Sequence, residues 1–117
     1  MTGAADSERS ALEIDSELKA DAARLTPVGE LDLATAPQLE QEVRSVLARS
    51  VREIVIDLSR LTFIDSSALR LFIVLNDRCA SEGWTLSLIR PTGKVRSVFE
   101  ITGAEENLPF IDDPGRA

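Results

Sequence analysis

The sequence contains no histidine and a single cysteine among its 117 residues, and these two shortages exclude several kinds of chemistry. Histidine is the usual general base of a Ser-His-Asp hydrolase and the commonest metal ligand, so such a hydrolase and a His-ligated zinc site are both ruled out. Cys79 has no second thiol with which to form an intramolecular disulfide. Its place among apolar helix residues predicts a small buried packing group rather than a redox sensor.

Long apolar runs are also missing. The run Leu71–Leu75 is soon interrupted by Asn76, whereas a bilayer span needs about 20 apolar residues. Met1–Ser10 is polar and acidic and lacks the apolar core of a signal peptide. We therefore expect a cytoplasmic protein that does not enter a membrane, with a flexible leader at residues 1–9 and a single domain at 10–117.

Positive charge is scarce, because 13 Lys and Arg stand against 20 Asp and Glu, for a net charge of −7. Nucleic-acid binding needs concentrated positive charge, so a protein partner is favoured over nucleic acid. The sequence also has no Gly-rich phosphate loop that would directly support nucleotide binding. We expect no cofactor and no metal.

An alternation of strand and helix patterns fills the rest of the chain. The expected strands are Ser10–Leu18, Ala22–Val28, Glu53–Leu58, Trp84–Ile89 and Leu108–Ile111. The expected helices are about Pro37–Arg49, Ser66–Glu82 and a helix that Pro91 opens and Gly103 ends. This order predicts an α/β fold with a mixed, mainly parallel sheet that opens with an antiparallel pair.

Particular residues predict the helix ends. Thr35 and Gln38 have the spacing of a capping box, and Pro37 suits the first helical turn. Gly83 can adopt the left-handed backbone that closes a helix.

The stretch Val51–Leu75 is the most informative part of the chain, because a buried strand leads through a polar turn to Asp65-Ser66-Ser67 at the start of a helix. Such residues are preferred at helix starts because their side chains accept the free N–H groups of the first turn, and the same N–H groups favour phosphate. The motif is therefore either a plain helix cap or a phosphorylation switch. Apolar residues surround almost the whole helix over Ala68–Leu75, which is either fully buried or partly a partner surface.

Asp57 suggests one alternative, since it ends a buried strand as the phosphorylated aspartate of a receiver domain does. The first strand, however, is not followed by the acidic pair that a magnesium ion would need there. A receiver is therefore disfavoured.

Three motifs together resemble the STAS family, the anti-sigma-factor antagonists. They are Gly29-Glu30-Leu31-Asp32, the strand-turn motif Ile54–Leu69, and Gly83–Leu88 followed by Pro91–Gly103, and the most specific parts are Gly29–Asp32 and Asp57–Leu69. The resemblance covers about residues 10–111 and implies that the helices lie chiefly on one face of the sheet.

The resemblance implies a switchable binding module without catalysis of its own. The unphosphorylated form would sequester an anti-sigma factor and so release a sigma factor for transcription. That anti-sigma factor would be a serine kinase that uses ATP to phosphorylate Ser67, with Ser66 as the alternative acceptor, and then dissociates. A PP2C-type phosphatase would reset the switch.

The residues expected to form the partner-binding surface are Gly29, Asp32, Asp65, Ser66, Leu69, Arg70, Phe72 and Ile73. For Gly29 and Asp32 a role in the turn alone is about equally favoured, because glycine permits tight backbone geometry and aspartate bonds local N–H groups.

The sequence departs from many relatives in two places. Ala68 stands where they carry glycine, which favours the helix. Only Asp112–Ala117 follow the last expected strand, so the final amphipathic helix of many relatives is absent or lies outside this sequence. The alternative function is a STAS scaffold or transport-associated regulatory domain without a serine switch, since fold alone does not determine function. The retained Asp65-Ser66-Ser67 favours the switch.

Overall fold

The computed structural model describes residues 11–113, so the leader expected at 1–9 lies outside the described residues. The strands are β1 (Leu12–Lys19), β2 (Ala22–Leu31), β3 (Glu53–Asp57), β4 (Leu61–Ile64), β5 (Thr85–Ile89) and β6 (Phe110–Ile111). The helices are α2 (Ala36–Leu47), α3 (Ser66–Glu82), α4 (Gly93–Thr102) and the short 3-10 helix η1 (Ala104–Asn107).

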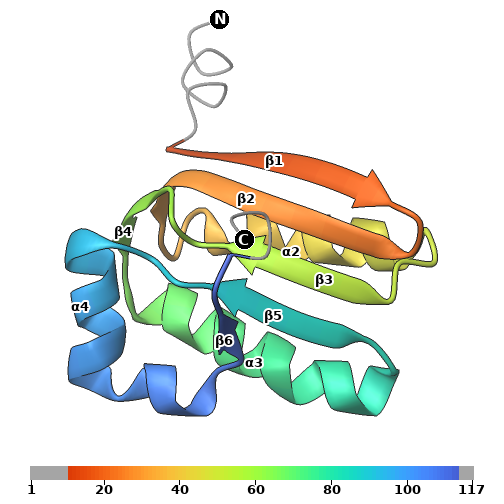
Figure 1. The fold of residues 1–117 in the computed structure, drawn as a ribbon. Coiled ribbons are helices and arrows are strands. Elements are labelled where there is room, and N and C mark those ends of the chain that lie inside the picture. The colour runs from red at the N-terminus through yellow and green to blue at the C-terminus, as the bar shows by residue number, and fades with distance from the viewer. Residues whose placement is uncertain (1–10, 114–117) are drawn as a thin grey trace, which may run out of the picture.

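The strands form one mixed sheet in the order β1-β2-β3-β5-β6 (Figure 1). The first two strands pair antiparallel, and every other pair is parallel. This arrangement confirms the predicted fold class, in which a mainly parallel sheet opens with an antiparallel pair.

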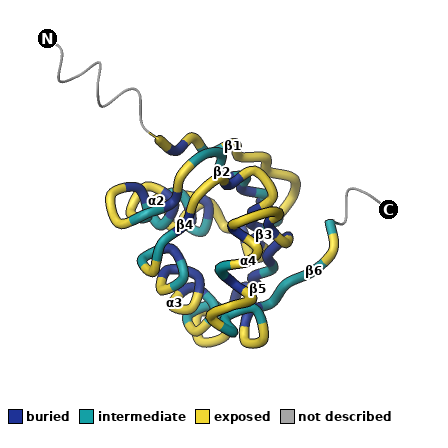
Figure 2. Tube along the Cα trace, turned by 90° about the vertical axis from the view of Figure 1, so that its left-hand side faces the viewer, coloured by how far each residue is buried: buried dark blue, intermediate teal, exposed yellow. Residues whose placement is uncertain are grey.

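Helices α2 and α3 lie together on one face of the sheet, as Figures 1 and 2 show from two directions. The core lies between them and the sheet, because alternate strand residues and one side of each helix are apolar. Fully buried members of this core include Leu25, Ile54, Ile56 and Leu88 from the strands and Leu39, Phe72 and Leu75 from the helices. Within residues 11–113, Figures 1 and 2 show no helix on the opposite face of the sheet.

Strand β4 differs from the prediction, which placed a turn there. It pairs in parallel with the end of β2, where Gly29 faces Leu61 and Leu31 faces Ile64, while β3 pairs with the start of β2. Two separate strands thus extend along one side of β2. β4 leads directly into α3 and so positions the predicted site.

The helix boundaries confirm two predictions and correct two. α3 spans the predicted residues, and Gly83 ends it with the expected left-handed backbone, at φ +80°. The capping box is wrong, because the Thr35 hydroxyl donates to the carbonyl of Glu30 at 2.9 Å and the Gln38 amide donates to the carbonyl of Leu12 at 3.1 Å. The helix predicted to open at Pro91 begins later, at Gly93.

Cys79 is partly buried against the core rather than fully buried. Within residues 11–113, no helix combines the length and the apolar character needed to cross a bilayer.

Candidate functional site

Asp65 is the N-cap of α3 and joins this helix to the loop before α2. Its Oδ1 accepts hydrogen bonds from the backbone N–H groups of Ser67 at 2.9 Å and Ala68 at 3.2 Å. Its Oδ2 accepts a hydrogen bond from the N–H of Leu33 at 3.1 Å. A carboxylate at this position satisfies N–H groups that the helix itself leaves without partners. One side chain therefore fixes where the two serines lie relative to Leu33.

The hydroxyls of Ser66 and Ser67 take no part in this capping. Neither Oγ makes a hydrogen bond to another residue within the part of the chain that the structure describes. Ser66 is exposed and Ser67 is half-buried in the first turn of α3. The cap and the candidate phosphoacceptor are therefore different residues, and the Ser67 hydroxyl is not committed to a structural bond.

Ser67 lines a shallow depression of about 220 Å³, which we call the Ser67 hollow. Its lining comes from the loop before α2, from α2 and from α3: Leu33, Ala36, Pro37, Glu40, Ser67, Arg70, Leu71 and Val74. Five of these eight side chains are apolar, and Arg70 is the one cation among them. Ser67 thus belongs to a mostly apolar surface, which suits contact with another protein.

Exposed apolar side chains occur in the lining of the hollow and elsewhere on α3 and β4. Leu33 is 76% exposed at its edge, and Val74 of its lining is also exposed. Ile73 is 45% exposed on the same helix, and Phe63 of β4 is exposed two residues before the Asp65 cap. Clustered exposed apolar groups with polar neighbours are typical of interaction surfaces.

Of the predicted partner residues, Arg70 lines this hollow, and the burial of another corrects the prediction. Arg70 and Ile73 are exposed and Leu69 is half-buried. Phe72 is fully buried, and its ring lies 6.2 Å from that of Phe99, so Phe72 belongs to the core and not to the surface. An apolar band around a helix cannot by itself show which of its residues point inward.

The backbone around position 29 leaves room only for glycine. Its φ is +117°, and a Cβ there would lie 2.1 Å from the carbonyl oxygen of Ala11. This close approach accompanies the hydrogen bond from Glu30 N–H to the same oxygen at 2.9 Å. The observed role of Gly29 is therefore to let β2 pass close to the chain before β1, and a partner contact by it stays a prediction.

Asp32 organises the loop between β2 and α2. Its Oδ1 accepts hydrogen bonds from the N–H groups of Ala34 at 3.0 Å and Thr35 at 3.1 Å. Its own N–H donates to the Thr35 hydroxyl at 3.0 Å. These bonds hold Leu33 outward between them, so Asp32 shapes the edge of the hollow indirectly.

Sequence reasoning missed Leu33, Pro37 and Glu40 as members of the site. Leu33 carried a usable signal, because it is a large apolar residue inside a short polar turn that has no strand or helix to bury it. Pro37 and Glu40 carried none, since both fit the ordinary pattern of the first turns of a helix.

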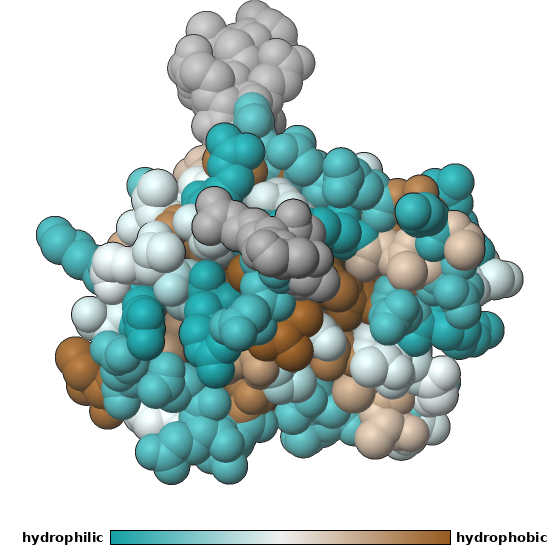
Figure 3. All heavy atoms as spheres, in the orientation of Figure 1, coloured by the Kyte–Doolittle hydropathy of each residue, from teal (hydrophilic) through white to brown (hydrophobic). Residues whose placement is uncertain are grey.

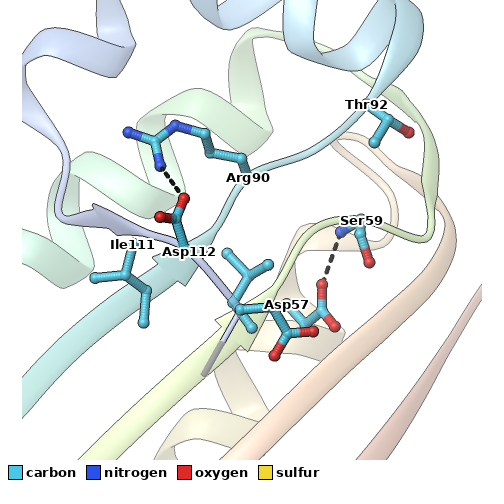
Figure 4. Close-up of a pocket in the computed structure, with 8 residues that line it drawn as sticks. Asp57, Ser59, Arg90, Thr92, Ile111 and Asp112 are labelled. Atoms are coloured by element: carbon cyan, nitrogen blue, oxygen red, sulfur yellow. Dashed lines mark hydrogen bonds and ion pairs between the residues drawn. The ribbon is translucent and has the colours of Figure 1, made fainter. Parts of the chain in front are cut away.

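A second, larger hollow of about 750 Å³ lies at the carboxyl ends of β3, β5 and β6 (Figure 4). Figure 3 shows apolar side chains near the centre of this side of the molecule, surrounded by polar ones. Asp57, Ser59, Arg90 and Asp112 line the hollow. Its polar groups bond to one another. Arg90 lies 3.5 Å from Asp112 in an ion pair, and the Ser59 N–H donates a hydrogen bond to Asp57 at 2.9 Å.

Arg24 completes this network from the helix-free face of the sheet. Its guanidinium binds Asp57 at 2.7 Å and Asp113 at 2.9 Å. Burial raises the pKa of Asp57, but hydrogen bonds from Ser59 and Arg24 outweigh it and hold that pKa below its ordinary value. The hydrogen bond to Asp113 raises the pKa of Arg24, burial opposes it, and the bond to Asp57 adds to the increase. The charges of this hollow are thus committed to structural pairs.

Comparisons with known proteins agree on one family. Residues 14–111 match the family model described as Mlab, STAS domain. BtrV of Bordetella bronchiseptica, provisionally named an anti-sigma factor antagonist, is 35% identical over 84 residues, which are 72% of each protein.

Solved structures show the same fold. An anti-sigma factor antagonist from Mycobacterium paratuberculosis superposes with a TM-score of 0.74 at 26% identity, over 89% of this chain and 88% of that one. The anti-sigma factor antagonist SpoIIAA in its unphosphorylated form has a TM-score of 0.70 at 22% identity, over 86% of this chain and 88% of its own. The phosphorylated form of Bacillus SpoIIAA has a TM-score of 0.65 at 21% identity, over 86% of this chain and 91% of its own.

Proposed function

The chain belongs to the STAS domain family of anti-sigma-factor antagonists, and we propose that it is a binding module switched by phosphorylation of Ser67. In this proposal the unphosphorylated protein sequesters an anti-sigma factor and thereby releases a sigma factor for transcription. The anti-sigma factor is also the serine kinase, and the protein has no catalytic role of its own. It works in the cytoplasm.

One observation supports Ser67 above all others: its hydroxyl is free of the helix cap, and the residue lines the Ser67 hollow together with the exposed Leu33 and Val74. The existence of SpoIIAA in a phosphorylated form supports the same kind of switch here. Ser66 remains the alternative acceptor, because it is exposed one residue earlier.

The switch follows from charge and burial. A kinase bound over the hollow would transfer the γ-phosphoryl group of ATP to the Ser67 Oγ and leave ADP. The product carries between one and two negative charges where the complex had a neutral hydroxyl. Burial of that charge in an unmatched interface costs on the order of 2–5 kcal/mol, so the complex would dissociate. A PP2C-type phosphatase would remove the phosphate and restore binding.

The partner surface in this proposal comprises residues of the Ser67 hollow together with residues of β2, of the loop before α2 and of α3 with its N-cap. It includes the predicted residues Gly29, Asp32, Asp65, Ser66, Leu69, Arg70 and Ile73 and adds Leu33 and Val74. Phe72 is left out because it is buried.

The decisive experiment combines phosphate mapping with binding. The protein is incubated with ATP and candidate anti-sigma kinases, and mass spectrometry locates the phosphate. Calorimetric titration then compares the wild type with Ser67→Ala and Ser67→Asp, beside thermal melts. Ser67→Ala should bind and resist release, while Ser67→Asp should stay folded and bind at least about thirtyfold more weakly.

Two controls separate this proposal from its rivals. Ser45→Asp places the same charge at an exposed serine of α2 outside the hollow and should bind normally. Ser66→Ala tests the alternative acceptor. Equal affinity of the wild type and both Ser67 variants would instead support a STAS scaffold or transport-associated regulator without a serine switch.

A further inference from the structure

Arg70 lies one helical turn after Ser67 and lines the same hollow. Residues three apart on a helix face each other, so the guanidinium can reach a group attached to the Ser67 Oγ. Arg70 is exposed, and its side chain forms no ion pair or hydrogen bond within residues 11–113. An exposed arginine whose side chain is not committed to a structural bond is therefore available beside the candidate acceptor.

The start of α3 offers little else to a phosphate. The N–H groups of Ser67 and Ala68, which would bind an anion at an uncapped helix, already donate to the Asp65 carboxylate. That carboxylate is itself negative and would repel phosphate. Two of the N–H groups through which a helix N-terminus usually attracts phosphate are thus already bonded to Asp65 in this protein.

The opposite wall of the hollow carries a second negative group. Glu40 of α2 lines the hollow, and its carboxylate is paired with Arg44 at 3.0 Å and with Arg78 at 3.8 Å. Arg44 and Arg78 lie outside the lining and are paired with Glu40 or Glu82, whereas Arg70 is the one cation in the lining and has no such pair within residues 11–113.

We propose that Arg70 is the intramolecular partner of a phosphate on Ser67, and that phosphorylation withdraws the Arg70 cation from the partner-binding surface. This inference rests on the proposed function of Ser67. A guanidinium binds phosphate through two parallel hydrogen bonds, which a hydroxyl cannot accept. Phosphorylation would therefore change two features of the surface at once, by adding a charge at Ser67 and by redirecting Arg70 toward it.

The test measures the second ionisation of the phosphate and needs no kinase. Phosphoserine is incorporated genetically at position 67, and its pKa is followed by phosphorus NMR. A nearby cation favours the dianion, so Arg70→Gln should raise this pKa by about 0.3 units or more. Arg70→Lys should keep part of the shift. Arg49→Gln removes an equal charge just beyond the C-terminal end of α2 and should leave the phosphate pKa unchanged.

The outcomes separate this inference from the proposed function. An unchanged phosphate pKa in Arg70→Gln, with an unchanged thermal melt, would overturn the Arg70 pairing and leave the Ser67 binding experiment standing. Equal binding by the Ser67 variants would overturn the proposed switch even where the phosphate pKa responds to Arg70. Equal shifts in Arg70→Gln and Arg49→Gln would also overturn the pairing, because they would reflect only total charge.

Discussion

The carboxylate of Asp65 accepts hydrogen bonds from two N–H groups of α3 and from one N–H of the loop before α2. Its removal should therefore destabilise both the helix and that loop. We expect Asp65→Ala to lower the free energy of unfolding by about 1–2 kcal/mol, measured by urea denaturation. Asp77→Ala removes an exposed carboxylate from the same helix and should change stability by less than about 0.5 kcal/mol. Equal effects of the two substitutions would contradict the capping role.

Two glycines with positive φ allow a matched test of steric contact. A Cβ at Gly29 would overlap the carbonyl of Ala11, whereas a Cβ at Gly83 would meet nothing within 4 Å. Gly83→Ala should therefore cost about 1 kcal/mol, for the left-handed backbone alone. Gly29→Ala should cost at least about 3 kcal/mol, because the strand must also shift. Thermal melts of both variants decide this, and similar costs would show that β2 can move away from Ala11.

At the scale of the element, α3 has a buried side and an exposed side. The adjacent residues Phe72 and Ile73 lie on different sides, since Phe72 is buried and Ile73 is exposed. Phe72→Ala should lower the free energy of unfolding by about 3–5 kcal/mol, because Phe72 is wholly buried against Phe99. Ile73→Glu should leave the melt nearly unchanged and abolish binding of the anti-sigma factor in a titration. Ile101→Glu provides the control, since Ile101 is 84% exposed and lies on α4 rather than on α3, the helix that carries Ser67 and Ile73. Normal binding by Ile73→Glu would remove Ile73 from the interface.

The sequence predicted the elements that have strong internal signals. α3 is long and ends at a glycine, and β3 and β5 are dense in apolar residues, so local pattern sufficed. β4 has only four residues, with exposed Thr62 and Phe63 between buried ends. Its strand conformation depends on pairing with the end of β2, which is a long-range contact that no local pattern records.

The candidate site was predicted in part for the same reason. Asp65, Ser66 and Ser67 are adjacent in sequence, so their place at a helix start could be read directly. The hollow also needs Leu33, which hydrogen-bonds to a residue 32 positions later. The predicted capping box does not form, because the Thr35 hydroxyl donates its hydrogen bond to the Glu30 carbonyl within the folded loop.

At the scale of the whole molecule, the paired charges of Arg24, Asp57 and Asp113 join β2, β3 and the chain after β6. The pKa of Asp57 lies below its ordinary value of 3.8, so the folded protein binds fewer protons there than the unfolded chain does. The stabilisation is thus complete above about pH 4 and is lost as the pH falls through the folded pKa. We expect Asp57→Asn to be less stable than the wild type by about 2 kcal/mol at pH 7.

Unfolding by urea at a series of pH values checks this expectation. The difference between the wild type and Asp57→Asn should shrink as the pH falls below about 4, because Asp57 then takes up a proton in the unfolded chain before it does so in the folded protein. Asp112→Asn is the control, since Asp112 is fully exposed and its pair with Arg90 is long. A difference that stays constant down to pH 2 would show that the charge of Asp57 does not carry the effect.

Strand β2 has a further consequence for the order in which the molecule opens. It is hydrogen-bonded to β1 on one side and to β3 and β4 on the other, while β6 is joined to the sheet through two residue pairs. Amide protons exchange with solvent at the rate at which their hydrogen bonds open, so a strand held on both sides exchanges last. The amides of β2 should therefore remain protected in deuterium oxide after those of β6 have exchanged, and β2 outlasts the strand at the far edge of the sheet.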